Sequence, residues 1–430
     1  MVPGVFAMTI LLGSVLLTLP FSSESGEWTS GWDALFTSAS AVCVTGLVRV
    51  DTADYWSVFG EVVIAVLIHV GGLGVTIYAG AMLLFLGRRF GLRERQFFGI
   101  ELSAGAAVLD IRAMLRRLMI FVVVVEGMTF ALLLPWSIAK DGPGTGVWHA
   151  AFHAISSFNN AGFDLMGGGR SFSGQAEDAY PLVVMGVSAF LGSLSFITVF
   201  DLRRRPRFWS LDTRLVTYGM GGLLLTGMLV FLGAELGSGR VMEGKGALSA
   251  LVNAFFLSVN RTTGMSTVDM SQLQDVTTAA LLVLMFIGGA STSVAGGIKV
   301  GAFMVSVVAV VSSLRGHHRP KAFGREIPQV VVLRAIAITM VGFATHVAGT
   351  WLLALTDGDI EFLPLLFEAM SALANVGWSQ GVTTQLSDVG AMIVLGLMFL
   401  GRLGSLVVAL SVPDRSEDVI RYPEAGVRLG

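Results

Sequence analysis

Four short apolar segments of this chain share one pattern of small and polar residues. Each carries a serine six residues before a glycine, and each ends at that glycine. The segments are Phe36–Gly46, Phe152–Gly162, Asn253–Gly264 and Phe367–Gly377, and their serines are Ser40, Ser156, Ser258 and Ser371. Because longer apolar stretches flank every copy, the pattern predicts four equivalent quarters whose glycines meet on one axis.

The chemistry that such an axis offers is the coordination of a cation by backbone oxygen atoms. Rings of carbonyl dipoles replace the hydration shell of an alkali cation in potassium channels, and glycine allows the backbone angles that turn successive carbonyls inward. We expect each segment to be a half-helix, too short to span a membrane, whose negative C-terminal end favours a cation. The expected ligands are the carbonyls of Val44, Thr45, Gly46, Asn160, Ala161, Gly162, Thr262, Thr263, Gly264, Asn375, Val376 and Gly377.

A simpler explanation exists for any single copy, because glycine is common at helix C-termini. Four copies in one register, inside one hydropathy pattern, favour a pore instead. No ring of carboxylates accompanies the glycines, which argues against a filter for divalent cations. Asp164 follows the second segment and would add negative potential at the outer mouth.

The composition is that of a membrane protein. Charged residues make up only 13% of the 430 residues, and the mean hydropathy is +0.75. Many apolar runs approach the ~20 residues that a spanning helix needs. The single cysteine, Cys43, excludes an internal disulfide, and no Cys/His cluster has the spacing of metal ligands. The net charge of −2 gives no indication of nucleic-acid binding.

An all-α fold with eight membrane-spanning helices around the four half-helices is expected. The spans pair as 2–19 with 57–86, 119–138 with 179–200, 214–232 with 277–312, and 330–355 with 389–411. The pore loops are 33–47, 148–163, 249–265 and 363–378. The units are residues 1–87, 88–202, 203–314 and 315–412, followed by a polar tail, 413–430.

The basic residues predict the orientation of the chain. Two spans per unit put all three linkers and the tail on one side, and these segments hold twenty of the 28 Lys and Arg residues. The opposite side carries Arg49, Lys140, Arg170, Arg240, Lys245 and Arg261. The positive-inside rule therefore predicts that the linkers and the C-terminus are cytoplasmic and that the protein lies in the cell's inner (plasma) membrane.

The stretch 277–312 is longer than one span and has a small, polar middle. Such residues form helices poorly, and unwound backbone at membrane depth is tolerated where it lines a watery cavity. We expect residues 288–297 to be an intramembrane gate below the filter. The alternative is a small-residue packing face of a long tilted helix. The expected gate residues are Gly288, Gly289, Ala290, Ser291, Thr292, Ser293, Gly296, Gly297, Lys299 and Arg402.

Ionisable residues inside membrane segments are candidates for function, since a central Arg costs ~2.5–3.5 kcal/mol on the insertion scale. Arg402 is expected either to bond to carbonyls of the gate or to raise a positive barrier under the filter; the alternative is that it reaches the cytoplasmic interface. For Lys299, a role in the gate and a position at the cytoplasmic interface are equally expected. His69 and Glu126 both lie within apolar spans, and His69 precedes a run of glycines; close helix packing by those glycines is favoured over a proton-relay role for either residue.

The motifs of the chain resemble the Trk/Ktr/HKT cation-transporter superfamily over essentially its whole length. The residues that carry the resemblance are Ala41–Leu47, Ser157–Phe163, Asn260–Met265, Met285–Gly289, Gly296–Lys299 and Met398–Gly404. Eight spans and the tail sequence Arg421–Glu424 are most similar to the KtrB type of membrane subunit. The gate segment departs from the family, because Ala290–Ser293 reads Ala-Ser-Thr-Ser where Ser-Pro-Gly-Ser is commoner.

The resemblance implies potassium uptake, since four filter glycines mark potassium selectivity in the family and all four are present here. It implies K+ bound at the filter carbonyls, no other cofactor in the chain, and a homodimer in the lipid membrane. It also implies a cytoplasmic ring of RCK-type, KtrA-like nucleotide-binding subunits. The chain itself has no Walker-type phosphate loop, so any dependence on a nucleotide must come from another polypeptide. A sodium-coupled potassium symporter and a sodium-permeable cation pore stay open, and with them a dependence on Na+.

Two other classes of function receive less support. An intramembrane enzyme is not expected, because the chain has no paired intramembrane carboxylates, no Gly-x-Ser-x-Gly elbow and no His-Glu-x-x-His helix. A non-conducting scaffold would differ from a pore in failing to take up rubidium.

Overall fold

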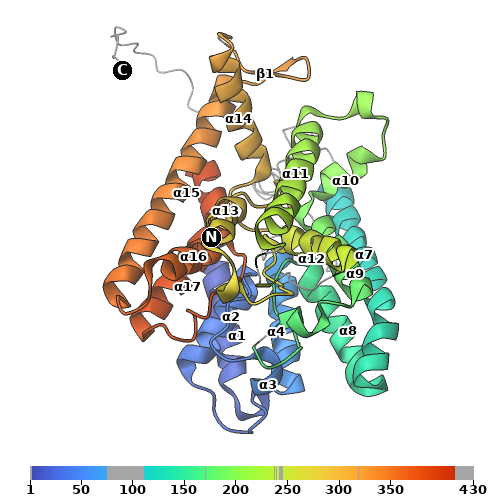
Figure 1. Ribbon diagram of the computed structural model, residues 1–430, viewed down its shortest axis with the longest axis vertical. Coiled ribbons are helices and arrows are strands. Elements are labelled where there is room, and N and C mark those ends of the chain that lie inside the picture. The colour runs from blue at the N-terminus through green and yellow to red at the C-terminus, as the bar shows by residue number, and fades with distance from the viewer. Residues whose placement is uncertain are drawn as a thin grey trace.

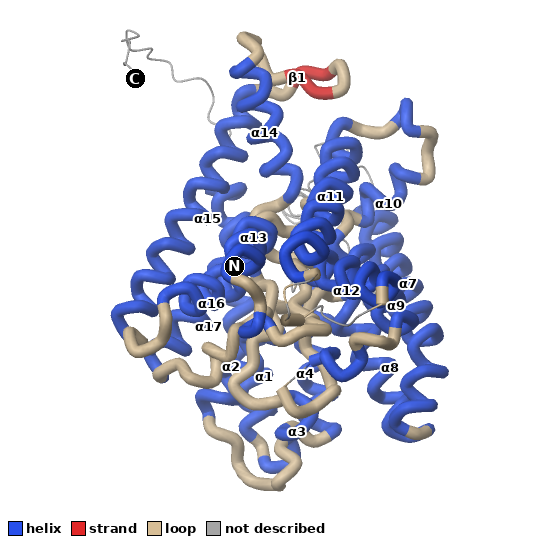
Figure 2. Tube along the Cα trace, viewed as in Figure 1, coloured by secondary structure: helices blue, strands red, loops and turns tan. Residues whose placement is uncertain are grey.

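The computed structural model of the protein describes residues 2–74, 111–169, 171–236, 238, 240–241, 246–317 and 319–411. The described part is mostly helical, with one short two-stranded hairpin (Figure 1). Figure 2 shows that helices surround a central region in which the chain runs as loops. The helices therefore enclose non-helical backbone at the centre of the molecule.

Each of the four short helices that precede the glycines follows a longer helix, and we call the four corresponding parts of the chain quarters. The first quarter has α1 (Val2–Thr18), α2 (Gly31–Cys43), α3 (Thr52–Tyr55) and α4 (Val58–Leu73). The second has α7 (Ile111–Asp141), α8 (Pro143–Phe158), α9 (Ala179–Ser193) and α10 (Phe196–Leu202). The third has α11 (Leu211–Val230), α12 (Ala247–Asn260), α13 (Asp275–Phe286) and α14 (Val300–Leu314). The fourth has β1 (Lys321–Ala322), β2 (Arg325–Glu326), α15 (Gln329–Thr356), α16 (Phe362–Ala374) and α17 (Asp388–Ser411).

Contacts between quarters close the fold into a ring. Within each quarter the long leading helix packs on the short one: α1 on α2, α7 on α8, α11 on α12, and α15 on α16. Between quarters, α4 contacts α8, α9 contacts α12, and α13 contacts α16. The last helix, α17, returns to contact α2 of the first quarter. Each short helix is therefore held between its own leading helix and a helix of the preceding quarter.

The short helices form the core of the molecule. The phenylalanine ten residues before the glycine is buried in three of them: Phe36 is 2% exposed, Phe152 is 1% exposed and Phe367 is fully buried. Large apolar side chains elsewhere face outward on the long helices, for example Val123 on α7 and Met340 on α15. An apolar exterior around a buried centre is the arrangement expected of a protein in lipid.

Three described helices are long and apolar enough to cross a membrane: Ala113–Asp141, Leu211–Glu235 and Gln329–Thr356. A fourth candidate is the pair α9 and α10, which is bent by 101° at its break. Six other apolar helices in the described ranges have 10–17 residues. The chain is thus a multi-pass membrane protein, while the count of eight spans and the fourfold pseudosymmetry stay predictions.

The structure breaks two of the stretches that the sequence pairs as spans. The break in 277–312 lies where the polar middle was expected, between α13 and α14. The break in 179–200 was not expected. There the Ser195 hydroxyl accepts a hydrogen bond from Ile197 N at 3.2 Å and starts α10, so the chain turns instead of continuing.

Some sequence predictions lie outside the described residues. These are the second part of the span 57–86, the boundary between the first two units, and the tail 413–430. The remaining unit boundaries fall in linkers between helices, which does not by itself test the division into units.

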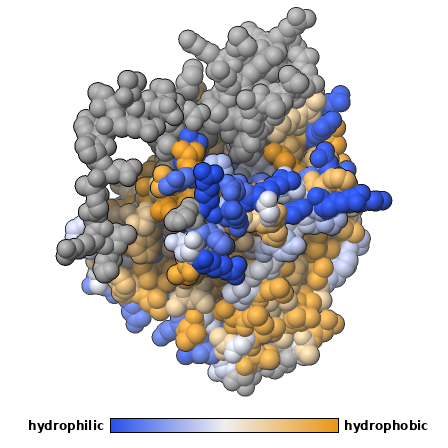
Figure 3. Space-filling view, turned by 90° about the horizontal axis from the view of Figure 1, so that it is seen from above, coloured by the Kyte–Doolittle hydropathy of each residue, from blue (hydrophilic) through white to orange (hydrophobic). Residues whose placement is uncertain are grey.

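Two linkers of the chain lie at the same end of the molecule. In Figure 1 the β1–β2 hairpin and the segment between α10 and α11 are both at the top. Seen from that end, hydrophilic residues gather beside apolar flanks (Figure 3). In the hairpin, hydrogen bonds from Lys321 and Arg319 lower the pKa of the Glu326 carboxyl. The shared end is what an even number of membrane crossings between the linkers requires.

Candidate functional site

The four short helices all end three or four residues before their glycines, at Cys43, Phe158, Asn260 and Ala374. The serine six residues before the glycine fixes the exit of the chain in two of them. Gly46 N donates to Ser40 Oγ at 3.0 Å, and Gly377 N donates to Ser371 Oγ at 3.0 Å. The recurring serine thus has a structural reason in the first and fourth quarters.

The serines of the other two quarters have different partners. Ser156 Oγ donates to Phe163 O at 2.5 Å, one residue beyond its glycine. Ser258 Oγ donates to Leu224 O on α11 at 2.7 Å, and so holds the short helix rather than the chain after it. The four quarters therefore share a sequence register without sharing every hydrogen bond.

The four glycines lie next to one another in a closed ring. A Cβ atom built on each glycine would lie within 2.4 Å of the carbonyl oxygen that precedes the glycine of the following quarter. The close pairs are Gly46 with Ala161 O, Gly162 with Thr263 O, Gly264 with Val376 O, and Gly377 with Thr45 O. The glycine φ angles are +91°, +76°, +87° and +106°, in the region that favours glycine. Space and conformation both require glycine here, and the ring gathers backbone oxygens from all four quarters.

A left-handed residue precedes three of the glycines by two positions. Val44 has φ 57°, Asn160 has φ 57° and Asn375 has φ 51°. Asparagine adopts this conformation readily, whereas it strains a β-branched residue such as Val44. The third quarter differs, since its α12 is followed by Arg261 in the right-handed region with φ −54°.

The chain just beyond the glycines is anchored to the short helices. In the fourth quarter the fully buried Glu368 accepts hydrogen bonds from Ser379 Oγ at 2.7 Å and from Thr383 Oγ1 at 2.5 Å. In the second quarter, His153 Nε2 accepts from Leu165 N at 3.0 Å. These side chains lie nine residues before their glycines, so one helix position holds the loop that follows the glycine in both quarters.

A titratable pair that sequence reasoning left unpaired lies behind the second quarter. His69 Nδ1 on α4 lies 3.1 Å from Glu126 Oε1 on α7, and Asn159 Nδ2 donates to the same oxygen at 2.7 Å. The glycines after His69 also pack closely, as expected: a Cβ on Gly71 would lie 2.0 Å from the backbone oxygen of Val42. The pair thus ties α4 and α7 to the end of α8.

The unwound segment between α13 and α14 is held against the break between α9 and α10. Ala290 N donates to Ser193 O at 2.9 Å, and Val294 N donates to Gly192 O at 3.3 Å. The Thr292 and Ser195 hydroxyls lie 2.7 Å apart. The unexpected bend in the second quarter therefore supplies the carbonyls that the unwound segment binds.

The same segment lies directly below the ring. A Cβ on Gly296 would lie 2.4 Å from Ala374 O, the last residue of α16. One on Gly288 would lie 1.8 Å from Gly296 O, so the two ends of the segment are in close contact. Gly289, Ser291 and Ser293 lie between these two ends, with Gly289 next to Ser193 O, and Gly297 follows them. The two ends of the segment therefore lie against each other, and the segment is compact and enclosed within the molecule.

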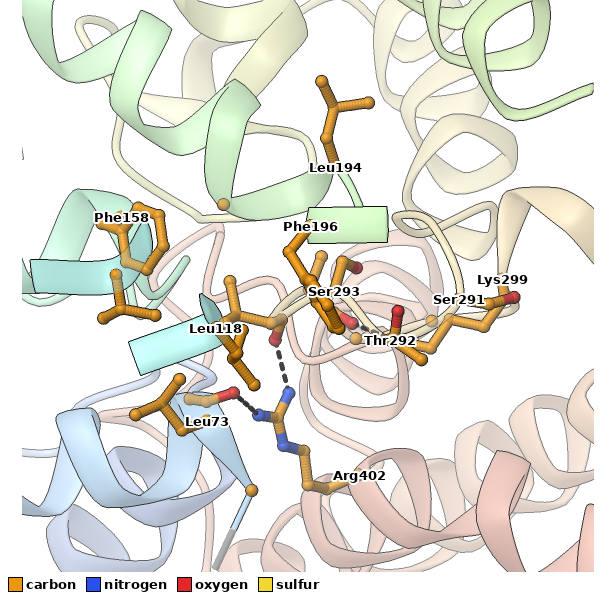
Figure 4. Close-up of a pocket in the computed structure, with 18 of the residues that line it drawn as sticks. Leu73, Leu118, Phe158, Leu194, Phe196, Ser291, Thr292, Ser293, Lys299 and Arg402 are labelled. Atoms are coloured by element: carbon orange, nitrogen blue, oxygen red, sulfur yellow. Dashed lines mark hydrogen bonds between the residues drawn. The ribbon is translucent and has the colours of Figure 1, made fainter. Parts of the chain in front are cut away.

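Arg402 on α17 joins this segment to the first quarter. Its Nη1 donates to Val294 O at 2.6 Å, and its Nη2 donates to Gly71 O and Gly72 O at 2.5 and 3.0 Å. Figure 4 shows the guanidinium between Leu73 at the end of α4 and the unwound segment, within a cavity of about 290 Å³. Lys299 donates from Nζ to Ala295 O at 2.6 Å, inside the segment itself.

Arg261, expected from the sequence on the outer side of the membrane, is buried within the protein. Its side chain is only 3% exposed, and its Nη1 donates to Ile287 O and, at 3.1 Å, to Leu284 O. These carbonyls belong to the C-terminal end of α13, whose unpaired acceptors attract a cation. The sequence signal was available, since Arg261 lies within the predicted pore loop 249–265.

Comparison with known proteins identifies the class to which this arrangement belongs. A sequence profile of the family "TrkH: Cation transport protein" matches residues 5–208 and 213–418. The chain belongs to this TrkH family of cation transport proteins, and its resemblance to the Trk/Ktr/HKT superfamily is confirmed.

Individual relatives cover almost the whole chain. The Ktr system potassium uptake protein B of Bacillus subtilis is 33% identical over 99% of this chain and 95% of its own length. The potassium/sodium uptake protein NtpJ of Enterococcus hirae is 32% identical over the same shares of the two chains. The crystal structure of the potassium transporter TrkH from Vibrio parahaemolyticus has a TM-score of 0.71 at 20% identity, covering 95% of this chain and 84% of that one. This last similarity shows the fold.

Proposed function

We propose that this chain is the membrane subunit of a potassium uptake system. K+ would pass between the four quarters and lose its hydration shell to the carbonyls named above as expected ligands. Relatives that this chain covers almost completely carry the name of potassium uptake proteins. An enzymatic role has no counterpart among these relatives, which are named as transport or uptake proteins.

The observation that carries the proposal is the closed ring of glycines and carbonyls. Four segments that are far apart in sequence each bring one glycine against the carbonyl oxygen of the next segment. Carbonyl oxygens of this kind replace the water around an alkali cation. The partial negative charge at the ends of α2, α8, α12 and α16 adds to the attraction.

The segment 288–297 is proposed as the gate of this pathway. Its support is its position against the last residue of α16 and its attachment to the carbonyls of Gly192 and Ser193. Arg402 would hold it in place, because the Arg402 guanidinium bonds to it and to α4 together. Displacing the segment would open the path from the ring towards the cavity beside Arg402.

Orientation and assembly complete the proposal. The basic linkers and the C-terminus would face the cytoplasm of a cell whose plasma membrane holds the protein. There a ring of RCK-type nucleotide-binding subunits would control a homodimer of this chain. Relatives are named as component B or D of a Ktr system, which is the support for a second component.

Uptake of radioactive rubidium by proteoliposomes tests the proposal. Liposomes loaded with K+ and diluted into K+-free buffer should accumulate Rb+ only when they contain the protein. External K+ should block the uptake at lower concentration than external Na+. Liposomes without protein are the control, and an absence of protein-dependent uptake at any K+ gradient would refute the proposed function.

A sodium-linked mode is the second candidate, because one relative is named a potassium/sodium uptake protein. In a symporter, an inward Na+ gradient would drive Rb+ uptake against its own gradient. In a sodium-permeable pore, radioactive Na+ would enter without any K+ gradient. A purely potassium-selective pore would show neither result.

A further inference from the structure

The filter residues carry side chains whose types alternate around the ring. Asparagine stands two residues before the glycine in the second and fourth quarters, as Asn160 and Asn375. Threonine stands one residue before the glycine in the first and third quarters, as Thr45 and Thr263. All four residues are completely buried, and each of their side chains makes a hydrogen bond to the neighbouring quarter.

The first asparagine bonds across to the third quarter. Thr263 Oγ1 donates to Asn160 Oδ1 at 2.8 Å, and Thr262 Oγ1 donates to the same oxygen at 2.9 Å. Asn160 Nδ2 donates to Phe158 O and Ala189 O, each at 3.1 Å. Because both carbonyls accept from the amide nitrogen, its oxygen must face the threonines.

The second asparagine bonds across to the first quarter. Asn375 Nδ2 donates to Thr45 Oγ1 at 3.0 Å and to Met398 O on α17 at 2.9 Å. This bond joins residues that are 330 positions apart in the chain. We name the Asn160–Thr263 and Asn375–Thr45 pairs the two latches.

The other two boundaries between quarters have different residues at these positions. Between the first and second quarters the corresponding pair is Val44 and Ala161, which have no polar side-chain atoms. Between the third and fourth quarters the corresponding pair is Thr262 and Val376, and the side chain of Val376 has no hydrogen-bonding group. There, a polar link occurs one residue beyond the glycines, from Trp378 Nε1 to Met265 O at 3.2 Å.

Each latch lies at the same boundary as one close contact of the ring. Thr263 O faces Gly162, the glycine two residues after Asn160, and Thr45 O faces Gly377, the glycine two residues after Asn375. A latch therefore fixes the spacing between a threonine carbonyl and the neighbouring glycine. A carbonyl ring that keeps its spacing cannot contract around a smaller cation, which is one basis of selectivity for K+ over Na+.

We infer that Thr45 and Thr263 are positioning residues, whose hydroxyls hold two of the four ring boundaries at the spacing that favours K+ over Na+. The inference rests on the proposed function, because it concerns the selectivity of the same ring. Two of the four boundaries are therefore latched and two are not, although the serine and glycine positions follow one register in all four quarters.

Valine replacements remove the latches and keep the shape of the side chain. Thr45→Val and Thr263→Val leave the backbone carbonyls in place and delete one hydroxyl each. In the rubidium assay, we expect the ratio of Na+ to K+ concentrations that half-block uptake to fall by about three- to tenfold in Thr45→Val. The fall in Thr263→Val should be smaller, because Thr262 Oγ1 still donates to Asn160 Oδ1. Thr45→Ser and Thr263→Ser keep the hydroxyl and should keep the ratio nearer that of the unmodified protein.

Thr267→Val is the matched control. Thr267 is 2% exposed, follows Gly264 by three residues, and has no hydrogen-bond partner for its hydroxyl within the described ranges. The control should therefore retain the unmodified ratio. If Thr263→Val does not fold, Thr45→Val tests the other latch by the same measurement, and the serine variant provides the folded comparison in each case.

The outcomes separate the inference from the proposed function. No rubidium uptake by the unmodified chain would overturn both together. Uptake by the unmodified chain, with the same Na+ to K+ ratio in Thr45→Val, Thr263→Val and Thr267→Val, would overturn the latches alone. A fall of the ratio in the two latch variants, and not in Thr267→Val, supports them.

Discussion

Removing the guanidinium of Arg402 should increase the flux of ions. Methionine at this position keeps an unbranched apolar stem and loses the three hydrogen bonds to Val294 O, Gly71 O and Gly72 O. Only the bond to Val294 O restrains the unwound segment, while the other two fasten the guanidinium to α4. The part of the restraint on the gate that Arg402 supplies is therefore one charge-assisted hydrogen bond, beside the bonds that Ala290, Thr292 and Val294 make to the break between α9 and α10.

The size of the effect follows from that single bond. A hydrogen bond to a charged group contributes about 1.5–3 kcal/mol, which corresponds to about a ten- to hundredfold change in an equilibrium constant. If the open state is the minor one, Arg402→Met should raise its population by this factor. Initial rates of rubidium uptake into proteoliposomes should rise accordingly, up to the limit set by full opening.

Arg240→Met is the matched control for this experiment. Arg240 also donates to a backbone carbonyl, Leu273 O at 3.1 Å, but in an outer loop away from the segment. Its replacement should leave uptake unchanged. Equal or lower uptake by Arg402→Met, at an unchanged thermal unfolding midpoint, would refute a blocking role for Arg402.

Three further predictions separate the roles of buried residues. Gly264→Ala should abolish K+ selectivity or uptake, because the added Cβ would lie 2.2 Å from Val376 O; rubidium and sodium fluxes measure this. Gly60→Ala should instead lower the unfolding midpoint, because its Cβ would lie 2.4 Å from Ser22 O and such overpacking costs ~1–3 kcal/mol. Since this contact is far from the ring, the ion selectivity of the molecules that fold should be unchanged. Glu368→Gln should weaken the anchoring of the outer loop by about 1 kcal/mol, since one of two accepted hydrogen bonds is lost; an unfolding midpoint in K+ equal to that of the unmodified chain would contradict this.

Sequence reasoning went furthest where local chemistry repeats. The serine and glycine register identified the four short helices, because glycine at positive φ is a local requirement that no neighbour can replace. The polar run after Phe286 likewise identified the break before α14, because low helix propensity can be read directly from the residue types. That Arg402 would either bond to carbonyls of the gate or raise a positive barrier followed from the cost of an Arg inside a membrane span, and the structure shows the first of these bonds, to Val294 O.

Features that depend on distant partners could not be predicted in the same way. At the bend after Ser193, the local cap by Ser195 is joined by hydrogen bonds from the unwound segment, about a hundred residues later in the chain, which no local pattern shows. The His69–Glu126 pair joins two spans whose relative rotation no hydropathy pattern specifies. The burial of Arg261 depends on which carbonyls α13 leaves unpaired, so its charge alone suggested the wrong environment.

The contact between α17 and α2 has a consequence for biosynthesis. The ribosome delivers the first quarter long before the fourth, yet the bond from Asn375 to Thr45 needs both. Until α16 and α17 have entered the bilayer, the polar backbone after Cys43 has no fourth neighbour and must be shielded by lipid headgroups, water or an insertase. A nascent chain stalled before α16 would therefore lack both the Asn375–Thr45 bond and the α17–α2 contact that close the ring.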